Sequence, residues 1–495
     1  MSTPIIILTI AGYIALLFLV AWLTSRNSDN ATFFTGGRKT PRLVAAIAMV
    51  GAAMSGVTYI SVPGTVLADH FSYLQTTLGF FVGYLIIAFV LVPLYYRLGV
   101  VSLYEYLDHR FGVTAHRTGA WLFFLSKIIA ASLRAFVVCV VLQALLFDAY
   151  DIPFVVNATI MMLLVWLYTR RGGVRSVVWS EMLKTIVMVG SIVACIVFII
   201  NAMELSFGGA ISKISSSDLS EVFFTDNALD RRYFWKQFIA GIFLVVAMTG
   251  MDQDMMQTVL SCRSARDSQR SLVVSIVVQI VVILLFLTLG ALFYLFLMER
   301  GVMPTDGAMP LVDGSGSVVV ARGDDIFGYV TTECGLPIIV GVLFLLGLVA
   351  STYSAAGSAL TALTTSFTLD ILGGKRLEDK ALIKLRRATH MLIAVVMTLI
   401  IVIFYHFSSG GVITLIFTMA SYTYGPLLGM FLFGLFTKRK VNEKALPLIA
   451  VVPPLLCYVL SSNATTWLCG YQFSYEIIVI NATLTMLCMW AFSKK

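Results

Sequence analysis

The chain has 495 residues, of which 59% are hydrophobic and 12% are charged, and its formal net charge is +8. A soluble globular chain carries about twice that charged fraction, so the composition excludes an ordinary soluble protein and indicates a polytopic membrane protein. The seven cysteines form neither a CxxC pair nor a cluster with histidine, which excludes a zinc site and a disulfide framework.

Thirteen apolar runs are long enough to cross a bilayer as helices. The first run has no basic segment before it and no clear cleavage site after it, so we expect a retained helix rather than a signal peptide. The predicted spans are residues 4–24, 43–68, 74–96, 119–146, 152–169, 176–201, 234–257, 271–298, 336–371, 386–406, 411–436, 443–461 and 472–493.

Lysine and arginine are distributed unevenly between the loops. When the N-terminus is placed outside, the inside loops hold 25 of these residues and the outside loops hold 6. This split predicts an N-terminus outside, a C-terminus inside and an odd number of spans. Two longer segments, 202–233 and 299–335, then lie outside, and the second contains a short helix over 325–334. An amphipathic piece over 101–111 lies inside.

Two predicted spans contain polar or helix-breaking interruptions. Gly51, Gly56 and Pro63 fall within 43–68, and residues 249–254 interrupt 234–257. Such breaks survive in a membrane where they line a cavity. The two spans are the first helices of two successive groups of five. Matched breaks favour a transporter built from inverted repeats over two unrelated kinks.

A polar stripe lies inside the long apolar run 336–371. The hydroxyls of Ser351, Ser354 and Ser358 share one helical face, and the small residues 355–357 let a second backbone approach it. A buried polar stripe needs partners, and a small cation that takes oxygen ligands is one candidate. The alternative is that each hydroxyl bonds the carbonyl one turn back in its own helix.

Several segments, in this order and spacing, resemble the sodium/solute symporter family, which carries sugars, proline, pantothenate and sialic acid with sodium. The similarity runs over about residues 5–440. The segments that carry it are Phe33–Arg38 (FFTGGR), Ser55–Gly64 (SGVTYISVPG), Ser102–Gly112 (SLYEYLDHRFG), Tyr168–Glu181 (YTRRGGVRSVVWSE), Asp252–Gln257 (DQDMMQ) and Ala350–Asp370.

The resemblance implies an all-α polytopic membrane protein with the LeuT-type five-plus-five inverted repeat and about 13 transmembrane helices. The whole chain, 1–495, would then form a single transmembrane transport domain. Its parts would be an extra N-terminal helix, two inverted repeats and two additional helices, over 4–24, 43–201, 234–436 and 443–493.

The resemblance also implies a sodium site between the first break and the polar stripe. Its ligands map to the carbonyls of Gly51 and Met54 and to the hydroxyls of Ser351 and Ser354. This set suits sodium, a hard cation that takes oxygen ligands. Ala355 departs from the family, because many members have a hydroxyl there.

A second sodium site would map to Ser354, Gly357, Ser358 and Glu181. Glu181 replaces the usual aspartate, and Gly357 offers no side chain. An acid within a span is costly and is a functional candidate. A structural pair between Glu181 and Lys184, three residues further on, is the alternative.

The implied substrate site lies at the bilayer midplane against the first break. Arg134 is the informative residue, because an arginine in mid-span must be paired or solvated. It matches the position where a sialic acid transporter holds a carboxylate, and a guanidinium suits that group. A structural pair with a buried acid, or solvation by the cavity, is the alternative. The candidate substrate residues are Ala53, Ser55, Thr58, Tyr73, Thr77, Arg134, Thr249 and Tyr422.

Asp252 and Asp254 are expected near the cytoplasmic end of their span, in a salt-bridge network with Arg263 and Arg266 that forms a gate.

The sequence thus predicts a sodium-coupled symporter for a small polar organic solute, and no enzyme. The solute is anionic, such as sialic acid or another carboxylate, or else a neutral sugar or polyol. A solute sensor with a transporter-like domain is a further alternative. We expect a monomer in a bacterial inner membrane, with sodium ions, a small solute and the lipid bilayer as partners. The net charge of +8 mostly reflects topology, so no nucleic-acid partner is expected.

Overall fold

The computed structural model describes residues 3–24, 33–34, 36–99, 104–304, 309–312, 318–321, 323–407 and 412–494. Of the segments discussed above, residues 35, 101–103, 305–308, 313–317, 322 and 411 lie outside this set.

The described chain is almost entirely helical. Four π-helical turns, at 87–91, 143–147, 246–250 and 367–371, continue the helices that precede them. The helices are α1 (Thr3–Thr24), α3 (Arg42–Ala53), α4 (Gly56–Gly64), α5 (Val66–Asp69), α6 (Tyr73–Ile86), α7 (Val92–Leu98), α8 (Glu105–Phe111), α9 (Val113–Leu142), α10 (Phe154–Ala202), α11 (Phe207–Ser215), α12 (Phe234–Val245), α13 (Gln253–Leu260), α14 (Ala265–Glu299), α15 (Gly323–Thr332), α16 (Ile338–Ser366), α17 (Asp379–Phe407), α18 (Val412–Phe436), α19 (Leu446–Ser462), α20 (Ala464–Trp467) and α21 (Ile477–Ala491). Two antiparallel strand pairs are β1 (Met309–Val312) with β2 (Val318–Ala321), and β3 (Lys440–Val441) with β4 (Ser493–Lys494).

Within the described residues, nine helices are long and apolar enough to cross a membrane, or eleven when each of two bent pairs counts as one span. Two shorter apolar helices, Phe154–Arg170 and Ile477–Ala491, coincide with further predicted runs. Helix α10 contains two predicted spans, which meet at Gly173 with a φ of 51°. A Cβ atom there would lie 2.5 Å from the Phe33 carbonyl oxygen, so this turn requires glycine. Each of the thirteen predicted runs therefore contains helix within the described residues, while the number that cross the membrane stays a prediction.

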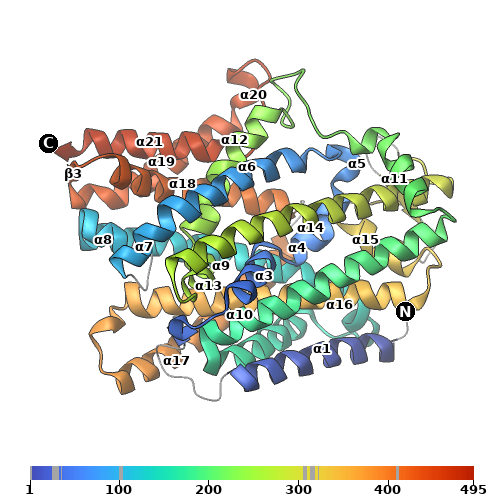
Figure 1. The fold of residues 1–495 in the computed structure, drawn as a ribbon, viewed down its shortest axis with the longest axis horizontal. Coiled ribbons are helices and arrows are strands. Elements are labelled where there is room, and N and C mark those ends of the chain that lie inside the picture. The colour runs from blue at the N-terminus through green and yellow to red at the C-terminus, as the bar shows by residue number, and fades with distance from the viewer. Residues whose placement is uncertain are drawn as a thin grey trace.

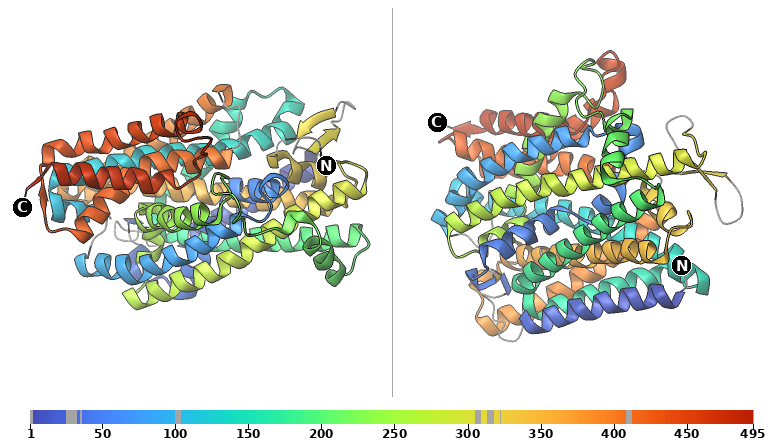
Figure 2. Two further views of the ribbon diagram at one scale, coloured as in Figure 1. Left: turned by 90° about the horizontal axis from the view of Figure 1, so that it is seen from above. Right: turned by 45° about the vertical axis from the view of Figure 1, so that its right-hand side comes forward.

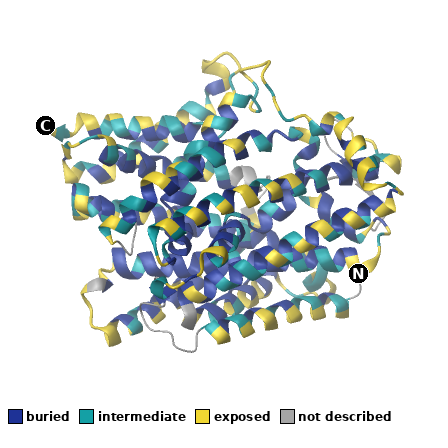
Figure 3. Cartoon of the chain, viewed as in Figure 1, coloured by how far each residue is buried: buried dark blue, intermediate teal, exposed yellow. Residues whose placement is uncertain are grey.

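The long helices run along one common direction, and the two chain ends lie at opposite ends of the bundle (Figure 1). The hairpin of β1 and β2 extends beyond the helices (Figure 2). Buried residues gather along the centre of the bundle, while exposed residues line its outer helices (Figure 3). Many exposed side chains of the outer helices are large and apolar, as expected for a surface that faces lipid.

Two helix breaks lie at the positions that the sequence predicts. Helices α3 and α4 meet at an angle of 60°, through extended backbone at Met54 and Ser55. Helices α12 and α13 meet at 69°, where Asp252 is extended. The prediction of two matched interruptions is confirmed, and each break turns backbone and polar side chains towards the interior.

Helix α15 is docked on α4 by a contact between two glycines. A Cβ atom on Gly64 would lie 2.1 Å from the Gly323 carbonyl oxygen, so both positions require the absence of a side chain. One turn and a half earlier on α4, the ring of Tyr59 stacks on Phe327 of α15 with centroids 4.9 Å apart. The short helix expected within the segment 299–335 is confirmed, and it packs directly on the broken helix.

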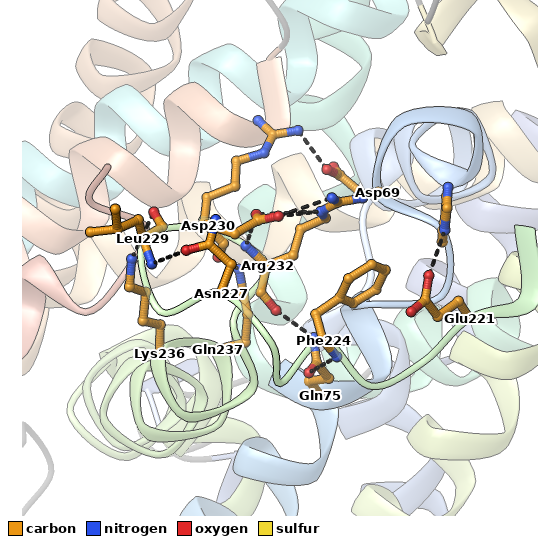
Figure 4. A network of polar contacts seen from close by, with 12 residues as sticks. Asp69, Gln75, Glu221, Phe224, Asn227, Leu229, Asp230, Arg232, Lys236 and Gln237 are labelled. Atoms are coloured by element: carbon orange, nitrogen blue, oxygen red, sulfur yellow. Dashed lines mark hydrogen bonds and ion pairs between the residues drawn. The ribbon is translucent and has the colours of Figure 1, made fainter. Parts of the chain in front are cut away.

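A polar network ties the segment between α10 and α12 to the start of α6 (Figure 4). The Gln75 side chain, which is fully buried, donates to the Arg232 carbonyl at 2.8 Å and accepts from the Phe224 amide at 3.3 Å. The Arg232 guanidinium in turn pairs with Asp230 at 2.9 Å. One glutamine thereby fixes a long connecting segment to the bundle.

Candidate functional site

A cavity lies where the two helix breaks approach each other. Its walls come from the α3–α4 break, α6, α9, the α12–α13 break, α14, α16 and α18. It encloses about 1280 Å³, counting the part that is open to solvent. Its lining mixes apolar side chains with a few charged and hydroxyl groups, as is usual for sites that bind a small organic solute.

Most of the predicted substrate residues line this cavity, and two do not. The Thr77 hydroxyl donates to the Tyr73 carbonyl at 2.9 Å and is buried away from the cavity. The Tyr422 ring packs on Tyr458 instead, and Tyr424, two residues further on, faces the cavity. Residues two apart on a helix lie on different faces, so Tyr424 and not Tyr422 borders this cavity. The residues that do line the cavity are Ala53, Ser55, Thr58, Tyr73, Arg134 and Thr249.

One side of the cavity carries a buried cluster of two carboxylates and a lysine. The Lys127 ammonium lies 3.1 Å from the Asp252 carboxylate and 2.7 Å from that of Asp254. The Tyr424 hydroxyl donates to Asp252 at 2.6 Å. Asp252 also caps α13 by accepting from the amides of Asp254 and Met255. The two aspartates therefore belong to the wall of the central cavity.

The prediction of a gate network between these aspartates and Arg263 and Arg266 is wrong, because both carboxylates pair with Lys127 of α9. The partners are 125 residues apart in sequence, and no local pattern joins them. Lys127 nevertheless carried a signal, since a lysine within a predicted span must find a partner. No feature of the sequence pointed to the hydrogen bond from Tyr424 to Asp252.

A second buried ion pair lies beside the cavity, and its Glu181, from α10, also lines the cavity. The Lys184 ammonium is 2.6 Å from the Glu181 carboxylate, and both side chains are fully buried. The other oxygen of Glu181 accepts a hydrogen bond from Ser354 at 3.0 Å. The structure thus contains the Glu181–Lys184 pair and also joins Glu181 to the polar stripe of α16.

The four residues expected to bind the first sodium lie around Glu181 and the α3–α4 break. A Cβ atom on Gly51 would lie 3.0 Å from a Glu181 oxygen, and one on Gly56 would lie 3.3 Å from the Ser351 hydroxyl. The Gly51 carbonyl accepts from the Met54 amide at 3.1 Å. The Ser351 hydroxyl donates to the Leu348 carbonyl at 2.8 Å, which is the one-turn-back bond considered above.

The remaining residues of the expected second sodium site have protein partners. The Ser358 hydroxyl donates to Asp254, which itself pairs with Lys127. The surface of Gly357 is covered by Tyr168, and a Cβ atom there would lie 1.7 Å from the tyrosine hydroxyl. The absence of a side chain at Gly357 thus makes room for Tyr168, which donates to the Tyr353 carbonyl at 2.8 Å.

Arg134 differs from both lysines of the site. It lines the cavity from α9, and it makes no ion pair or hydrogen bond with another residue of the described chain. Within the same residues, no group of three or more His, Cys, Asp or Glu side chains is placed to hold a metal ion. A cation at this site would therefore depend on hydroxyl and carbonyl oxygens with at most a pair of carboxylates.

A bundle of apolar helices in which two broken members border a buried, charged cavity defines a secondary membrane transporter. The chain belongs to the Sodium:solute symporter family, whose family model matches residues 33–448. It is therefore a multi-pass, sodium-coupled solute symporter and not an enzyme, as the sequence predicts.

Individual relatives are distant in sequence but similar over most of their length. The "Sodium/sialic acid symporter SiaT" of Proteus mirabilis (strain HI4320) is 22% identical over 502 residues, which cover 94% of this chain and 92% of that protein. The human "Sodium/iodide cotransporter" is 24% identical over 446 residues, 86% of this chain and 65% of the cotransporter. A solved Na⁺-coupled sialic acid symporter, in a substrate-bound outward-open state, superposes with a TM-score of 0.80 at 18% identity and covers 99% of both chains. The fold is thus the helical, LeuT-like fold of these transporters.

Proposed function

We propose that this symporter takes up a small organic anion with a carboxylate, such as sialic acid or another sugar acid, by alternating access. Arg134 carries the proposal. A guanidinium that faces a cavity without a protein partner is a receptor for a planar, bidentate anion. The sialic acid and iodide named for two relatives are both anionic, which supports this class of solute.

The charges around the cavity support the same proposal. Three basic side chains, Lys127, Arg134 and Lys184, are matched by three acidic ones, Asp252, Asp254 and Glu181. A sodium ion alone would leave one uncompensated positive charge in a low-dielectric site, which is costly. A carboxylate that enters with the sodium restores the balance. The two ligands therefore favour each other's binding electrostatically, which is a direct source of coupling.

We propose that the sodium binds between the α3–α4 break and α16, at the carbonyls of Gly51 and Met54 and the hydroxyls of Ser351 and Ser354. Both hydroxyls can reach a cation by rotation about one side-chain bond. A second sodium at Glu181 and Ser358 would have to displace an ammonium group from a carboxylate on each side. We therefore propose that one sodium accompanies each solute.

We further propose a single transport domain of 13 spans with two inverted repeats, over 43–201 and 234–436. The N-terminus would lie outside and the C-terminus inside a bacterial inner membrane, and the protein would act as a monomer. The chain ends at opposite ends of the bundle are consistent with an odd number of spans (Figure 1). The matched breaks at Met54 and Asp252 are consistent with the repeats.

The test of the substrate class is sodium-driven uptake into proteoliposomes by wild type, Arg134→Gln and Arg134→Lys. Charge-assisted bonds to an arginine contribute about 1.5–3 kcal/mol, so the glutamine variant should lose about 10- to 100-fold in uptake of sialic acid at low concentration. The lysine variant should retain part of this uptake, because it keeps the positive charge but lacks the planar guanidinium that forms two parallel hydrogen bonds. The unfolding temperature should stay unchanged, since no ion pair is broken. Uptake of neutral sugars alone by the wild type would contradict the proposal.

A further inference from the structure

A groove on the outer surface of the bundle combines three arginines with an apolar floor. Its walls come from the start of α3, the π-helical turn 87–91 and the first turns of α14. The groove encloses about 1190 Å³, counting the part that is open to solvent. Its lining includes Arg42, Leu43, Phe89, Arg266, Arg270 and Val274.

The three guanidiniums of the groove have no acidic partner. Arg42, Arg266 and Arg270 are exposed, and none of them makes an ion pair with another residue that the structure describes. Arg42 is the first residue of α3, and Arg266 lies in the first turn of α14. The amino end of a helix carries partial positive charge, to which Arg42 and Arg266 add. Asp267, also in the first turn of α14, accepts from the Ser264 hydroxyl at 2.9 Å and makes no ion pair with the three arginines. The three guanidiniums therefore remain open to an anionic ligand.

The spacing of the arginines is fixed by hydrogen bonds between the two helices. The Ser271 hydroxyl of α14 donates to the Arg42 carbonyl at 2.9 Å. One turn further on, the Ser275 hydroxyl donates to the Ala46 carbonyl, also at 2.9 Å. The three arginines are therefore held in place by one partly buried and one buried hydrogen bond between two helices, and not by a loop.

The apolar part of the groove continues from the arginines along the surface of the bundle. Leu43, Phe89 and Val274 are exposed by 63%, 61% and 44%. On α14 the spacing of Arg266, Arg270 and Val274 is four residues, so basic and apolar side chains succeed each other along one helical face. A ligand that fits must carry an anionic group at one end and a hydrocarbon chain at the other.

We propose that this groove binds one anionic glycerophospholipid of the surrounding bilayer. Its phosphodiester would pair with Arg42, Arg266 and Arg270, and an acyl chain would lie over Leu43, Phe89 and Val274. Basic pockets between membrane helices are suited to such headgroups. The site is separate from the central cavity, and it does not depend on the nature of the transported solute.

The test uses delipidated, purified protein titrated with phosphatidylglycerol or phosphatidylcholine, with bound lipid counted by native mass spectrometry. The groove variant is R42Q/R266Q/R270Q. The control R117Q/K380Q/K384Q removes the same charge from exposed residues elsewhere. Wild type and control should retain one phosphatidylglycerol in preference to phosphatidylcholine, and the groove variant should bind it about 10- to 100-fold more weakly. Equal binding by the groove variant, or an equal loss in the control, would overturn the proposal.

A second variant distinguishes a lipid from free phosphate. Val274→Gln places a polar side chain where the acyl chain would lie and leaves the arginines intact. Phosphatidylglycerol binding should weaken severalfold in this variant, and inorganic phosphate should not displace the lipid from the wild type. Displacement by millimolar phosphate, with no effect of Val274→Gln, would show a phosphate site instead and would refute the lipid proposal.

Discussion

The Lys184 ammonium lies 2.6 Å from the Glu181 carboxylate, less than one helical turn away on α10, and both side chains are completely buried. The same carboxylate accepts a hydrogen bond from Ser354 of the proposed sodium site. Lys184 thus acts as an internal cation at the edge of that site. It compensates the charge of Glu181 in the structure.

Removal of one partner of this pair should destabilise the protein strongly. Glu181→Gln or Lys184→Met leaves one buried charge uncompensated, which typically costs about 3–5 kcal/mol. The double variant E181Q/K184M removes both charges and should recover most of that loss. Thermal unfolding followed by intrinsic tryptophan fluorescence measures the effect. Additive losses in the double variant would show that the two groups do not interact.

One sodium carried with one monovalent carboxylate moves no net charge. Initial uptake should therefore be independent of a potassium-diffusion potential imposed with valinomycin at a fixed sodium gradient. Each net charge would instead contribute about 2.3 kcal/mol per 100 mV. Uptake that accelerates when the interior is made negative would indicate a second sodium, and it would contradict the role proposed for Lys184.

The Ser354 hydroxyl should be necessary for sodium dependence. Ser354→Ala removes one proposed oxygen ligand, and the sodium concentration for half-maximal uptake should rise by at least about tenfold, equivalent to about 1.4 kcal/mol. Thr365→Ala is the control, because that hydroxyl bonds the Thr361 carbonyl within the same helix at 2.9 Å. Unchanged sodium dependence in the Ser354 variant would place the sodium elsewhere.

The pair of Asp230 and Arg232 should give the segment between α10 and α12 a pH-dependent stability. The Arg232 guanidinium hydrogen-bonds Asp230 and holds the pKa of that carboxyl below its usual value. The contribution is therefore fully present above the unfolded pKa, near 4, and is lost as pH falls through the lower folded pKa. Asp230→Asn should cost about 0.5 kcal/mol at pH 7, and the difference should shrink only below about pH 4.

Asp226→Asn serves as the matched control for this prediction. Asp226 is an exposed aspartate of the same segment and makes no ion pair with a described residue. Its replacement should leave the unfolding temperature unchanged at both pH values. A loss of stability in Asp230→Asn that is equally large at pH 3 would show that the carboxylate charge is not the cause.

The arrangement of the helices could be predicted from sequence because the bilayer imposes it. Long apolar runs must form helices, since no water satisfies their backbone groups. The breaks at Met54 and Asp252 could also be predicted, because glycine, proline and polar residues interrupt the apolar pattern there. These features are local in the chain, and local physics determines them.

The pairing of the charges inside the bundle could not be predicted. Asp252 and Asp254 lie close in sequence to Arg263 and Arg266, yet the fold brings Lys127 to them from another helix. A shift of two positions moves a side chain to the other side of a helix, so the sequence could not decide whether Tyr422 or Tyr424 faces the cavity. The family resemblance predicted where the cavity lies, and only the structure shows which charged residues pair inside it.

The glycine contact between α4 and α15 connects an exposed part of the protein to the broken helix beside the central cavity. Gly64 and Gly323 touch backbone to backbone, and Tyr59 stacks on Phe327, so the two helices must move as one body. Glu333, directly after α15, is exposed. A fluorophore attached there would report movement of α4, which borders the central cavity, without any label inside that cavity.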